Sequence, residues 1–324
     1  MPTIGLFLSS EERTAPELVE LAARGEAAGF PCAWISDHFH PWTDAQGQSP
    51  LVWSVIGALA HTTSRLVVGT GVTCPTMRVH PTLVAQAAAT SAAMMPGRFF
   101  LGVGTGENLN EHIVGARWPS IEVRQEMLEE AVAIIRQLWQ GGYQDHHGRH
   151  YTVENARLYT LPPEPPALVV AAAGPKSAEL AGRIGDGLVC TSPGRELVER
   201  FTAAGGGDKP RYAELTVCWA KDEKSARRTA HRIWPIAALT GPLSTELALP
   251  AHFEAAAKMV TEDALAEEVP CGPDPERHVA AIQAYAQAGF DHVCVHQVGP
   301  EQEGFLRFYA REVLPKLERR RAAA

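Results

Sequence analysis

A histidine and a carboxylate stand side by side where a short apolar segment ends, in the sequence WISDHFHPW at residues 34–42. The apolar residues before them are typical of a buried strand and Pro41 marks a loop, so Asp37 and His38 fall at a strand's C-terminal end. Imidazole is the side chain that exchanges protons near neutral pH. The segment therefore predicts an acid–base site with Trp42 as a flat wall beside it. The alternative is that these rings only plug the top of the fold.

A second segment, RFFLGVGTGENLNE at residues 98–111, runs from a predicted strand into Gly102, Gly104 and Gly106 and then Glu107. The spacing is G-x-G-x-G and not the G-x-G-x-x-G of a dinucleotide fold, which is a weak match. Glycines at a strand end let a flat ligand approach the backbone closely. Glu107 would then lie at that ligand; the alternative is a tight turn with a solvated carboxylate.

Two further segments carry weaker signals. The sequence VVGTGVTCPTMRVHP at residues 67–81 leaves a strand through Gly and Thr, which suits a bulge beneath a ring system. The strand predicted over Gly187–Thr191 ends in hydroxyl side chains that can bind phosphate or sugar oxygens. Each alone is equally typical of a plain loop. The histidines of DHHGRH at residues 145–150 have no second ligand group at suitable spacing, so we predict no metal site.

These residues must be positioned by strands that alternate with helices. Nearly continuous apolar runs are typical of strands in a parallel sheet that is buried on both faces. The predicted strands are Ile4–Leu8, Cys32–Ser36, Leu66–Thr73, Arg98–Val103, Ala167–Ala172, Gly187–Thr191, Ala213–Trp219 and Asp291–Val295. The predicted helices between them include Pro16–Ala28, Pro81–Met94, Val123–Gln140, Lys176–Ile184 and Arg277–Ala288.

Eight strands interleaved with helices, without a break in composition, predict an α/β fold: a single (β/α)8 TIM-type barrel over residues 1–324. A doubly wound open sheet is the alternative. Two segments interrupt the alternation of strands and helices and are predicted to be insertions. Residues 141–166 are predicted to form a short hairpin with a Pro-rich connection, and residues 237–273 are predicted to be helical and are Ala-rich. Insertions in such barrels usually build the mouth of the site at the C-terminal face.

The amino-acid composition limits the classes of molecule that the protein can bind. The chain has 324 residues, 45% of them hydrophobic and 20% charged, which excludes wholesale disorder. The net charge of −8, without a Lys/Arg block, argues against nucleic acid and anionic membranes as partners. The N-terminal sequence lacks a basic region, no stretch approaches the ~20 apolar residues of a membrane span, and the six cysteines are scattered without C-x-x-C spacing. We therefore predict a cytoplasmic protein with a small-molecule substrate.

Together the segments resemble the luciferase-like flavin and deazaflavin superfamily, and within it the F420-dependent glucose-6-phosphate dehydrogenase group. The resemblance covers essentially the whole chain. It is carried, in family order, by SDHFHPW, GTGV, PGRFFLGVGTGENLNE, AAAGP, GDGLVCTS and DPERHV. It implies an enzyme, usually a homodimer, that binds coenzyme F420 across the C-terminal face and transfers a hydride between the deazaflavin and an alcohol or carbonyl.

The resemblance also implies roles for individual residues. His38 would take the proton of the substrate alcohol, and Asp37 and Trp42 would contact the deazaflavin and the reacting carbon. Glu107 would supply a proton to the reduced ring, and Glu11 would line the site.

Further positions match the family's cofactor contacts. A non-proline cis peptide that supports the ring would fall at Gly71 and Val72. Cys74 stands in the same loop where the family usually has Thr. The remaining matched positions are Thr105, Gly106, Asn110, Ala171, Ala172, Ala173 and Thr191.

The chain departs from the group at the sugar phosphate, which two lysines and an arginine hold in the dehydrogenases. Gly194 and Ala255 stand where we place the lysines, with Arg195 and Lys258 nearby, and only Arg277 matches the third position. We therefore expect a substrate other than glucose 6-phosphate. Alternatives to this activity are an FMN-dependent monooxygenase, a non-catalytic deazaflavin carrier, and an acid–base barrel without cofactor such as a hydrolase.

Overall fold

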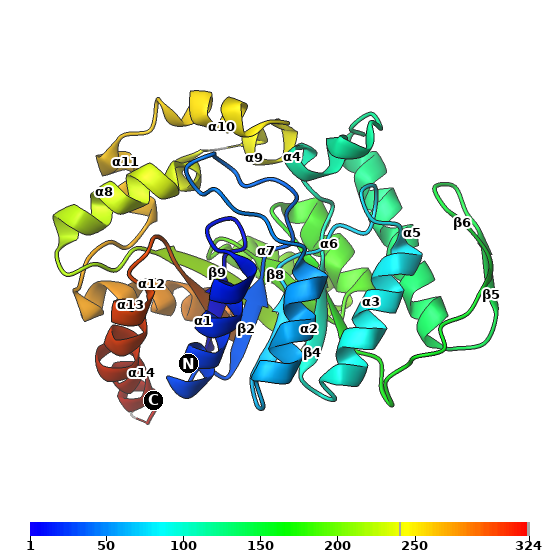
Figure 1. Ribbon diagram of the computed structural model, residues 1–324, viewed down its shortest axis with the longest axis horizontal. Coiled ribbons are helices and arrows are strands. Elements are labelled where there is room, and N and C mark those ends of the chain that lie inside the picture. Colours follow the sequence, from blue (N-terminus) through cyan, green and yellow to red (C-terminus); the bar gives the residue numbers. More distant parts are fainter. Residues whose placement is uncertain (240, 323–324) are drawn as a thin grey trace.

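Eight parallel strands close into a barrel at the centre of the molecule (Figure 1). The structure, a computed structural model, describes residues 1–239 and 241–322. The barrel strands are β1 (Thr3–Leu8), β2 (Cys32–Ile35), β3 (Val67–Thr70), β4 (Phe99–Val103), β7 (Ala167–Ala171), β8 (Gly187–Cys190), β9 (Arg211–Val217) and β10 (His292–Gln297). They follow one another in chain order, and β10 pairs with β1. The predicted (β/α)8 barrel is confirmed, and the open-sheet alternative is wrong.

Helices surround the barrel, and the five that the sequence predicts begin and end within two residues of the expected positions. Their bounds, with the shorter helices, are α1 (Ala15–Ala27), α2 (Val52–Thr62), α3 (Pro81–Met94), α4 (Asn108–Glu111), α5 (Ile121–Trp139), α6 (Pro175–Ile184), α7 (Arg195–Phe201), α8 (Glu223–Ile233), α9 (Leu243–Glu246), α10 (Pro250–Ala257), α11 (Glu262–Glu268), α12 (Pro275–Ala288), α13 (Gln302–Phe308) and α14 (Leu314–Ala322). Local signals explain the agreement. At the start of α1 the Thr14 backbone N–H donates to Glu17 Oε2 over 2.8 Å, which satisfies a free helix donor.

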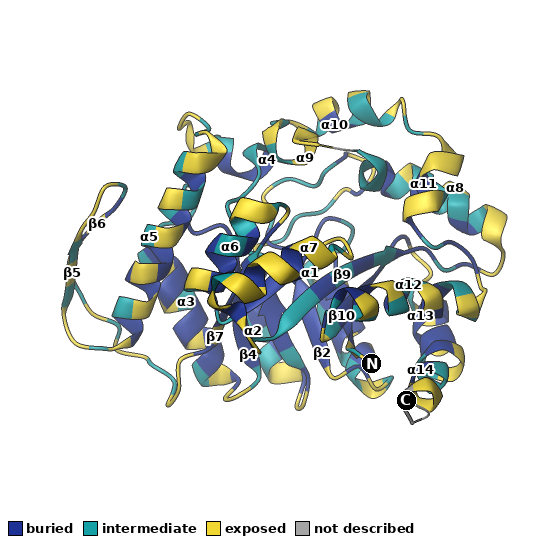
Figure 2. Ribbon diagram, turned by 180° about the vertical axis from the view of Figure 1, so that it is seen from behind, coloured by how far each residue is buried: buried dark blue, intermediate teal, exposed yellow. Residues whose placement is uncertain are grey.

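The lower half of the barrel interior is filled by aromatic side chains. Trp34 from β2, Phe100 from β4 and Tyr212 from β9 meet there, with the Phe100 and Tyr212 rings stacked at 5.1 Å. A Cβ at Gly69 would lie 2.1 Å from Phe100 Cζ, so this position has room only for glycine. Figure 2 shows the strands as the most deeply buried elements. Because the interior is plugged from below, a ligand reaches the barrel from the C-terminal ends of the strands.

The segment 237–273 and helix α8 lie over the C-terminal ends of the strands, at the top of Figure 1. The segment 141–166 forms the hairpin of β5 (Gln144–His147) and β6 (Thr152–Ala156), which runs along the outer side of α5. Its His146 Nε2 lies 3.0 Å from Glu130 Oε1 on α5, and Tyr151 donates its hydroxyl proton to the Thr76 carbonyl in the loop after β3. The hairpin therefore braces the rim from outside.

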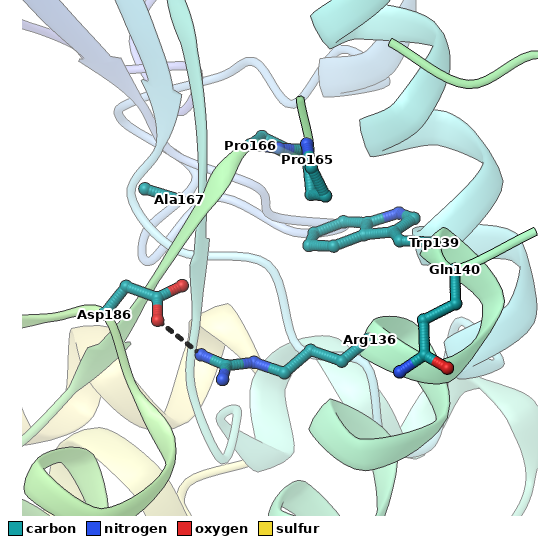
Figure 3. A pocket seen from close by; sticks show the side chains of 7 residues that line it. All are labelled: Arg136, Trp139, Gln140, Pro165, Pro166, Ala167 and Asp186. Atoms are coloured by element: carbon teal, nitrogen blue, oxygen red, sulfur yellow. Dashed lines mark hydrogen bonds and ion pairs between the residues drawn. The ribbon is translucent and has the colours of Figure 1, made fainter. Parts of the chain in front are cut away.

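The opposite end of the barrel has a shallow depression of about 440 Å³ beside the start of β7. Figure 3 shows Trp139, Pro165 and Pro166 along its wall and the ion pair between Arg136 and Asp186 across it. The depression lies between the C-terminal end of α5 and the starts of β7 and β8, at the end of the barrel opposite the predicted site residues. In the part of the chain that the structure describes, no helix has the length and apolar character needed to cross a membrane.

Candidate active site at the C-terminal face of the barrel

His38 lies just beyond β2 with its ring held between a carbonyl and a carboxylate. Its Nδ1 is 3.2 Å from the His40 backbone oxygen, and its Nε2 is 3.4 Å from Glu11 Oε1. A carbonyl oxygen only accepts hydrogen bonds, so Nδ1 carries the hydrogen and Nε2 is the nitrogen that can take up a proton. The carboxylate of Glu11 faces that nitrogen and would stabilise the imidazolium once it forms.

Glu11 is fixed in this orientation by two hydroxyl groups. Its side chain is buried, and Oε2 accepts hydrogen bonds from Ser9 Oγ at 2.9 Å and from Ser36 Oγ at 2.7 Å. Both donors bind the same oxygen, which leaves Oε1 directed at His38. The loops after β1 and β2 thus meet at one histidine–carboxylate pair, and Glu11 lies beside His38 as the resemblance implies.

Trp42 forms an aromatic wall on the other side of His38. The two ring centroids are 4.9 Å apart, and Phe253 from α10 meets the indole edge-on at 5.2 Å. Phe253 is completely buried, so the 237–273 segment closes over the outer face of Trp42.

Asp37 takes part in a buried ionic network that sequence reasoning does not reveal. Its Oδ2 accepts from Thr73 Oγ1 at 2.7 Å, and its Oδ1 accepts from Arg78 Nη2 at 3.0 Å. Arg78 also binds Glu111, with its backbone N–H 2.7 Å from Glu111 Oε2. Burial disfavours the guanidinium of Arg78, but the two carboxylates outweigh burial and raise its pKa. Burial raises the pKa of Glu111 despite the opposing effect of Arg78. Nothing in the sequence marks Arg78, because its partners lie 33 and 41 residues away.

Asn110 connects the two richest sequence segments. Its Oδ1 accepts from the backbone N–H groups of Phe39 at 2.9 Å and His40 at 3.2 Å, and its Nδ2 donates to Glu107 Oε2 at 3.3 Å. Glu107 precedes α4 and is half-buried. The structure therefore brings Glu107 to the same rim as the loop that carries His38, as predicted.

Small apolar groups form a shelf on the β3–β4–β7 side of the mouth. The peptide between Gly71 and Val72 is cis, which confirms that prediction. A Cβ on Gly104 would lie 2.9 Å from Val72 Cγ2 and 3.4 Å from the Ala171 methyl group. The side chains of Val72 and Ala171 therefore pack directly against Gly104, where a larger residue would not fit, and the three residues form a small apolar shelf that suits a flat ring.

Cys74 lies beneath the glycine-rich loop. A Cβ on Gly106, which has φ of +76°, would lie 2.5 Å from Cys74 Sγ, so this close contact requires glycine. Burial and the nearby Glu111 raise the pKa of the Cys74 thiol well above its usual range, and its sulfur contacts Thr76 Oγ1 at 3.0 Å. Cys74 is therefore an uncharged packing group in this arrangement.

The remaining predicted cofactor positions lie at strand ends around the same rim. Thr105 is half-buried after β4, and Ala172 is buried while Ala173 is exposed after β7. Thr191 is exposed after β8, where its carbonyl accepts from the Tyr285 hydroxyl at 3.2 Å.

The candidate anion positions do not form a cationic site. Gly194 precedes α7, and the guanidinium of Arg195 donates to the Gln287 carbonyl at 2.7 Å, on α12. Arg277 pairs with Glu223 at 2.8 Å and donates to two backbone carbonyls. Ala255 and Lys258 are exposed on or next to α10. The arginines near a phosphate position are thus engaged elsewhere.

Comparison with known proteins connects this geometry to a family. Residues 2–292 match the family described as luciferase-like monooxygenase. An F420-dependent glucose-6-phosphate dehydrogenase from Beutenbergia cavernae is 36% identical over 99% of this chain and 98% of its own. F420-dependent glucose-6-phosphate dehydrogenase 1 from Rhodococcus jostii is 37% identical over 97% of both chains.

Among solved structures, an F420-dependent secondary alcohol dehydrogenase in complex with an F420-acetone adduct superposes with a TM-score of 0.90 and 31% identity, covering 97% of this chain and 98% of that one. A coenzyme F420-dependent tetrahydromethanopterin reductase from Methanopyrus kandleri shares the fold, with a TM-score of 0.80 and 20% identity over 97% of this chain and 99% of that one.

Proposed function

The chain belongs to the luciferase-like monooxygenase family, and from this premise we propose that it is an F420-dependent oxidoreductase that interconverts an alcohol and a carbonyl compound. The observation that carries the proposal is the His38–Glu11 pair, whose Nε2–Oε1 distance is 3.4 Å, at the rim of a barrel with a small apolar shelf. A hydride leaves a carbinol carbon only as its hydroxyl loses a proton, so a base and a flat acceptor are both needed.

The residues of the shelf fit a planar cofactor. Val72, Gly104 and Ala171 would hold the ring of coenzyme F420, and Asp37, Cys74, Thr105, Gly106, Asn110, Ala172, Ala173 and Thr191 are the further positions that would surround it. Coenzyme F420, when bound, supplies the hydride acceptor or donor.

The side chains of the protein carry out the proton transfers that accompany hydride transfer. Nε2 of His38 takes the proton from the substrate hydroxyl, and Glu11 stabilises the resulting imidazolium. Trp42 confines the substrate against His38 and excludes water from that side. Glu107, whose Oε2 accepts from Asn110, lies on the cofactor side of the site and would exchange a proton there. In the reverse direction His38 returns its proton to the carbonyl oxygen.

We propose an uncharged substrate and not glucose 6-phosphate. No lysine or arginine stands at Gly194 or Ala255, and both Arg195 and Arg277 are engaged by other groups. The solved relative at 31% identity is an F420-dependent secondary alcohol dehydrogenase, which supports a small neutral alcohol or ketone. The FMN-dependent monooxygenase is the weaker alternative, since the relatives that cover nearly the whole chain at 31–37% identity are F420-dependent dehydrogenases.

Titration of the purified protein with F420 and with FMN, followed by fluorescence, tests the proposal. We expect saturable binding of F420 and at least tenfold weaker binding of FMN. Reduction of bound F420 by an uncharged alcohol should follow. Tighter binding of FMN, with oxygen consumption in the presence of reduced FMN, would favour the monooxygenase, and F420 binding without turnover of any alcohol or carbonyl would favour the carrier.

We also infer that residues 1–324 form a single domain that acts as a cytoplasmic homodimer. One closed barrel extends from β1 to β10, which supports the single domain. All six cysteines are buried free thiols, which suits a reducing compartment. Leu83 and Met94 are both at least half exposed on α3, which supports a subunit contact there. Light scattering on a size-exclusion column tests the dimer.

A further inference from the structure

A second histidine is buried next to the candidate site, and the mechanism above does not use it. His296 on β10 is only 1% exposed, with its ring between Phe7 at 5.0 Å and Trp234 at 4.4 Å. Its Nε2 lies 2.8 Å from Glu12 Oε1, and its Nδ1 lies 3.4 Å from Glu214 Oε1 on β9. Sequence reasoning missed all three residues because they come from the first loop and the last two strands.

Glu12 ties the loop after β1 to the loop after β10. Its Oε1 binds His296, and its Oε2 accepts from the Gly299 backbone N–H at 2.8 Å. Arg13 donates to the Gly299 carbonyl at 2.5 Å, and the same guanidinium nitrogen is 3.9 Å from Glu12 Oε2. The turn that carries Glu12 is therefore fastened to β10 and its loop by several polar contacts.

Glu11, the next residue in the chain, is the carboxylate that faces His38 Nε2. One short turn thus presents two successive carboxylates, each to a different histidine: Glu11 toward β2 and Glu12 toward β10. Because the two residues share a peptide bond, any rotation of the turn that frees Glu12 also displaces Glu11. The anchoring of Glu12 therefore bears directly on the geometry of the proposed base.

We propose that His296 is a positioning residue for His38: by anchoring Glu12 it fixes Glu11, and so sets the tautomer and the basicity of His38. The inference rests on the proposed function for its catalytic meaning, but the coupling itself is a property of the cofactor-free chain. The His296–Glu12 pair is ionic. Burial opposes ionisation of both partners, yet their mutual attraction lowers the pKa of Glu12 and raises that of His296 to about 9.

The charged groups around His296 and His38 determine whether the loss of the His296 charge raises or lowers the titration midpoint of His38. His296 faces Glu12, with Arg13 behind it, and Glu214; the uncharged thiols of Cys294 and Cys218 lie beside these carboxylates. Among the described residues, the ionisable side chain that faces His38 is that of Glu11. Loss of the positive charge of His296 leaves a more negative surrounding, which favours the imidazolium form of His38.

The test is ring nitrogen NMR of histidine in the cofactor-free protein, with His296→Gln as the main variant. Glutamine removes the positive charge that attracts Glu12 and offers it at most a neutral hydrogen bond, so the anchor is weakened. We expect the titration midpoint of His38 to move upward by a few tenths of a pH unit or more, because one positive charge is removed from its surroundings. Because a carboxylate opposite Nε2 favours hydrogen on that nitrogen, loosening of Glu11 should also make the Nδ1–H tautomer of His38 more populated.

A second variant and a control keep the test decisive. Glu12→Gln removes a negative charge, so it should move the His38 midpoint downward. His278→Gln is the matched control, because His278 is also fully buried and, among the described residues, its ring nitrogens hydrogen-bond the Tyr309 hydroxyl and the Gly272 carbonyl. It should leave His38 unchanged.

Unchanged midpoint and tautomer of His38 in folded His296→Gln and Glu12→Gln, as judged by circular dichroism, would overturn the proposal. If the NMR shifts occur but no alcohol is oxidised, the proposed function fails and the coupling stands. If alcohol oxidation is found, the pH profile of kcat/KM should move in the same direction as each NMR midpoint, with KM changed less than twofold.

Discussion

Two histidine–carboxylate pairs lie at the same end of this barrel and differ in what surrounds them. His38 is at the rim, faces one carboxylate at 3.4 Å and has an aromatic wall at its side. His296 is sealed between two rings and two carboxylates and has no open face. The first arrangement leaves a nitrogen able to gain and lose a proton, whereas the second holds its proton. The comparison teaches that the number and closeness of the surrounding carboxylates, more than residue type, separate a base from an anchor.

Removal of His38 tests the difference between the two histidines most strongly. We expect His38→Ala to lower alcohol oxidation by about 10²–10⁴-fold, the usual value of a positioned base. Binding of F420 should persist, because the shelf of Val72, Gly104 and Ala171 does not involve His38. Steady-state kinetics and a cofactor titration measure the two effects. Unchanged turnover would show that His38 is only a packing residue.

Removal of the sealed histidine should act on stability first. His296→Ala leaves the buried Glu12 carboxylate and the half-buried Glu214 carboxylate without their partner, and breaking a buried pair typically costs about 3–5 kcal/mol. Urea denaturation measures the loss of unfolding free energy. A loss below about 1 kcal/mol would mean that water enters the site and that the pair is not sealed.

The pH dependence of stability tests whether His296 carries a positive charge in the folded protein. The His296 pKa is raised from 6.5 to about 9, so its contribution is complete below pH 6.5 and is lost as the pH rises to about 9. This loss is on the order of 3 kcal/mol. The wild-type melting temperature should therefore fall over this range, while the difference from His296→Gln shrinks. A constant difference across that range would contradict the assignment of the charge.

A smaller effect is expected at the cofactor side of the rim. Glu107→Gln keeps the Asn110 contact possible but removes the proton donor, so turnover should fall by roughly tenfold to a hundredfold with little change in melting temperature. Asn108→Ala serves as a control in the same short helix, since its side chain donates to the Glu246 carbonyl. If stability falls and the activity per folded molecule does not, Glu107 is structural.

Sequence predicts the barrel well because its signals are local. Apolar runs such as Phe99–Val103 and capped helices such as α1 depend on residues close together in the chain. It also places His38 and Glu107 at strand ends. It cannot reveal that Asn110 joins Glu107 to the loop that follows His38, that Arg78 links Asp37 to Glu111, or that Glu12 meets His296 across 284 residues. These contacts form only when the barrel closes.

The central claim is that an uncharged alcohol or carbonyl reacts with F420 at this rim. Deazaflavin absorbance should be followed with a series of secondary alcohols and with glucose 6-phosphate, and in the reverse direction with ketones and reduced F420. Two missing charge-assisted contacts of about 1.5–3 kcal/mol each should make the phosphate ester bind at least a hundredfold more weakly than in an enzyme with both lysines. We predict that at least one neutral alcohol is oxidised with a kcat/KM above that of glucose 6-phosphate. Efficient oxidation of glucose 6-phosphate, faster than every neutral compound, would contradict the account.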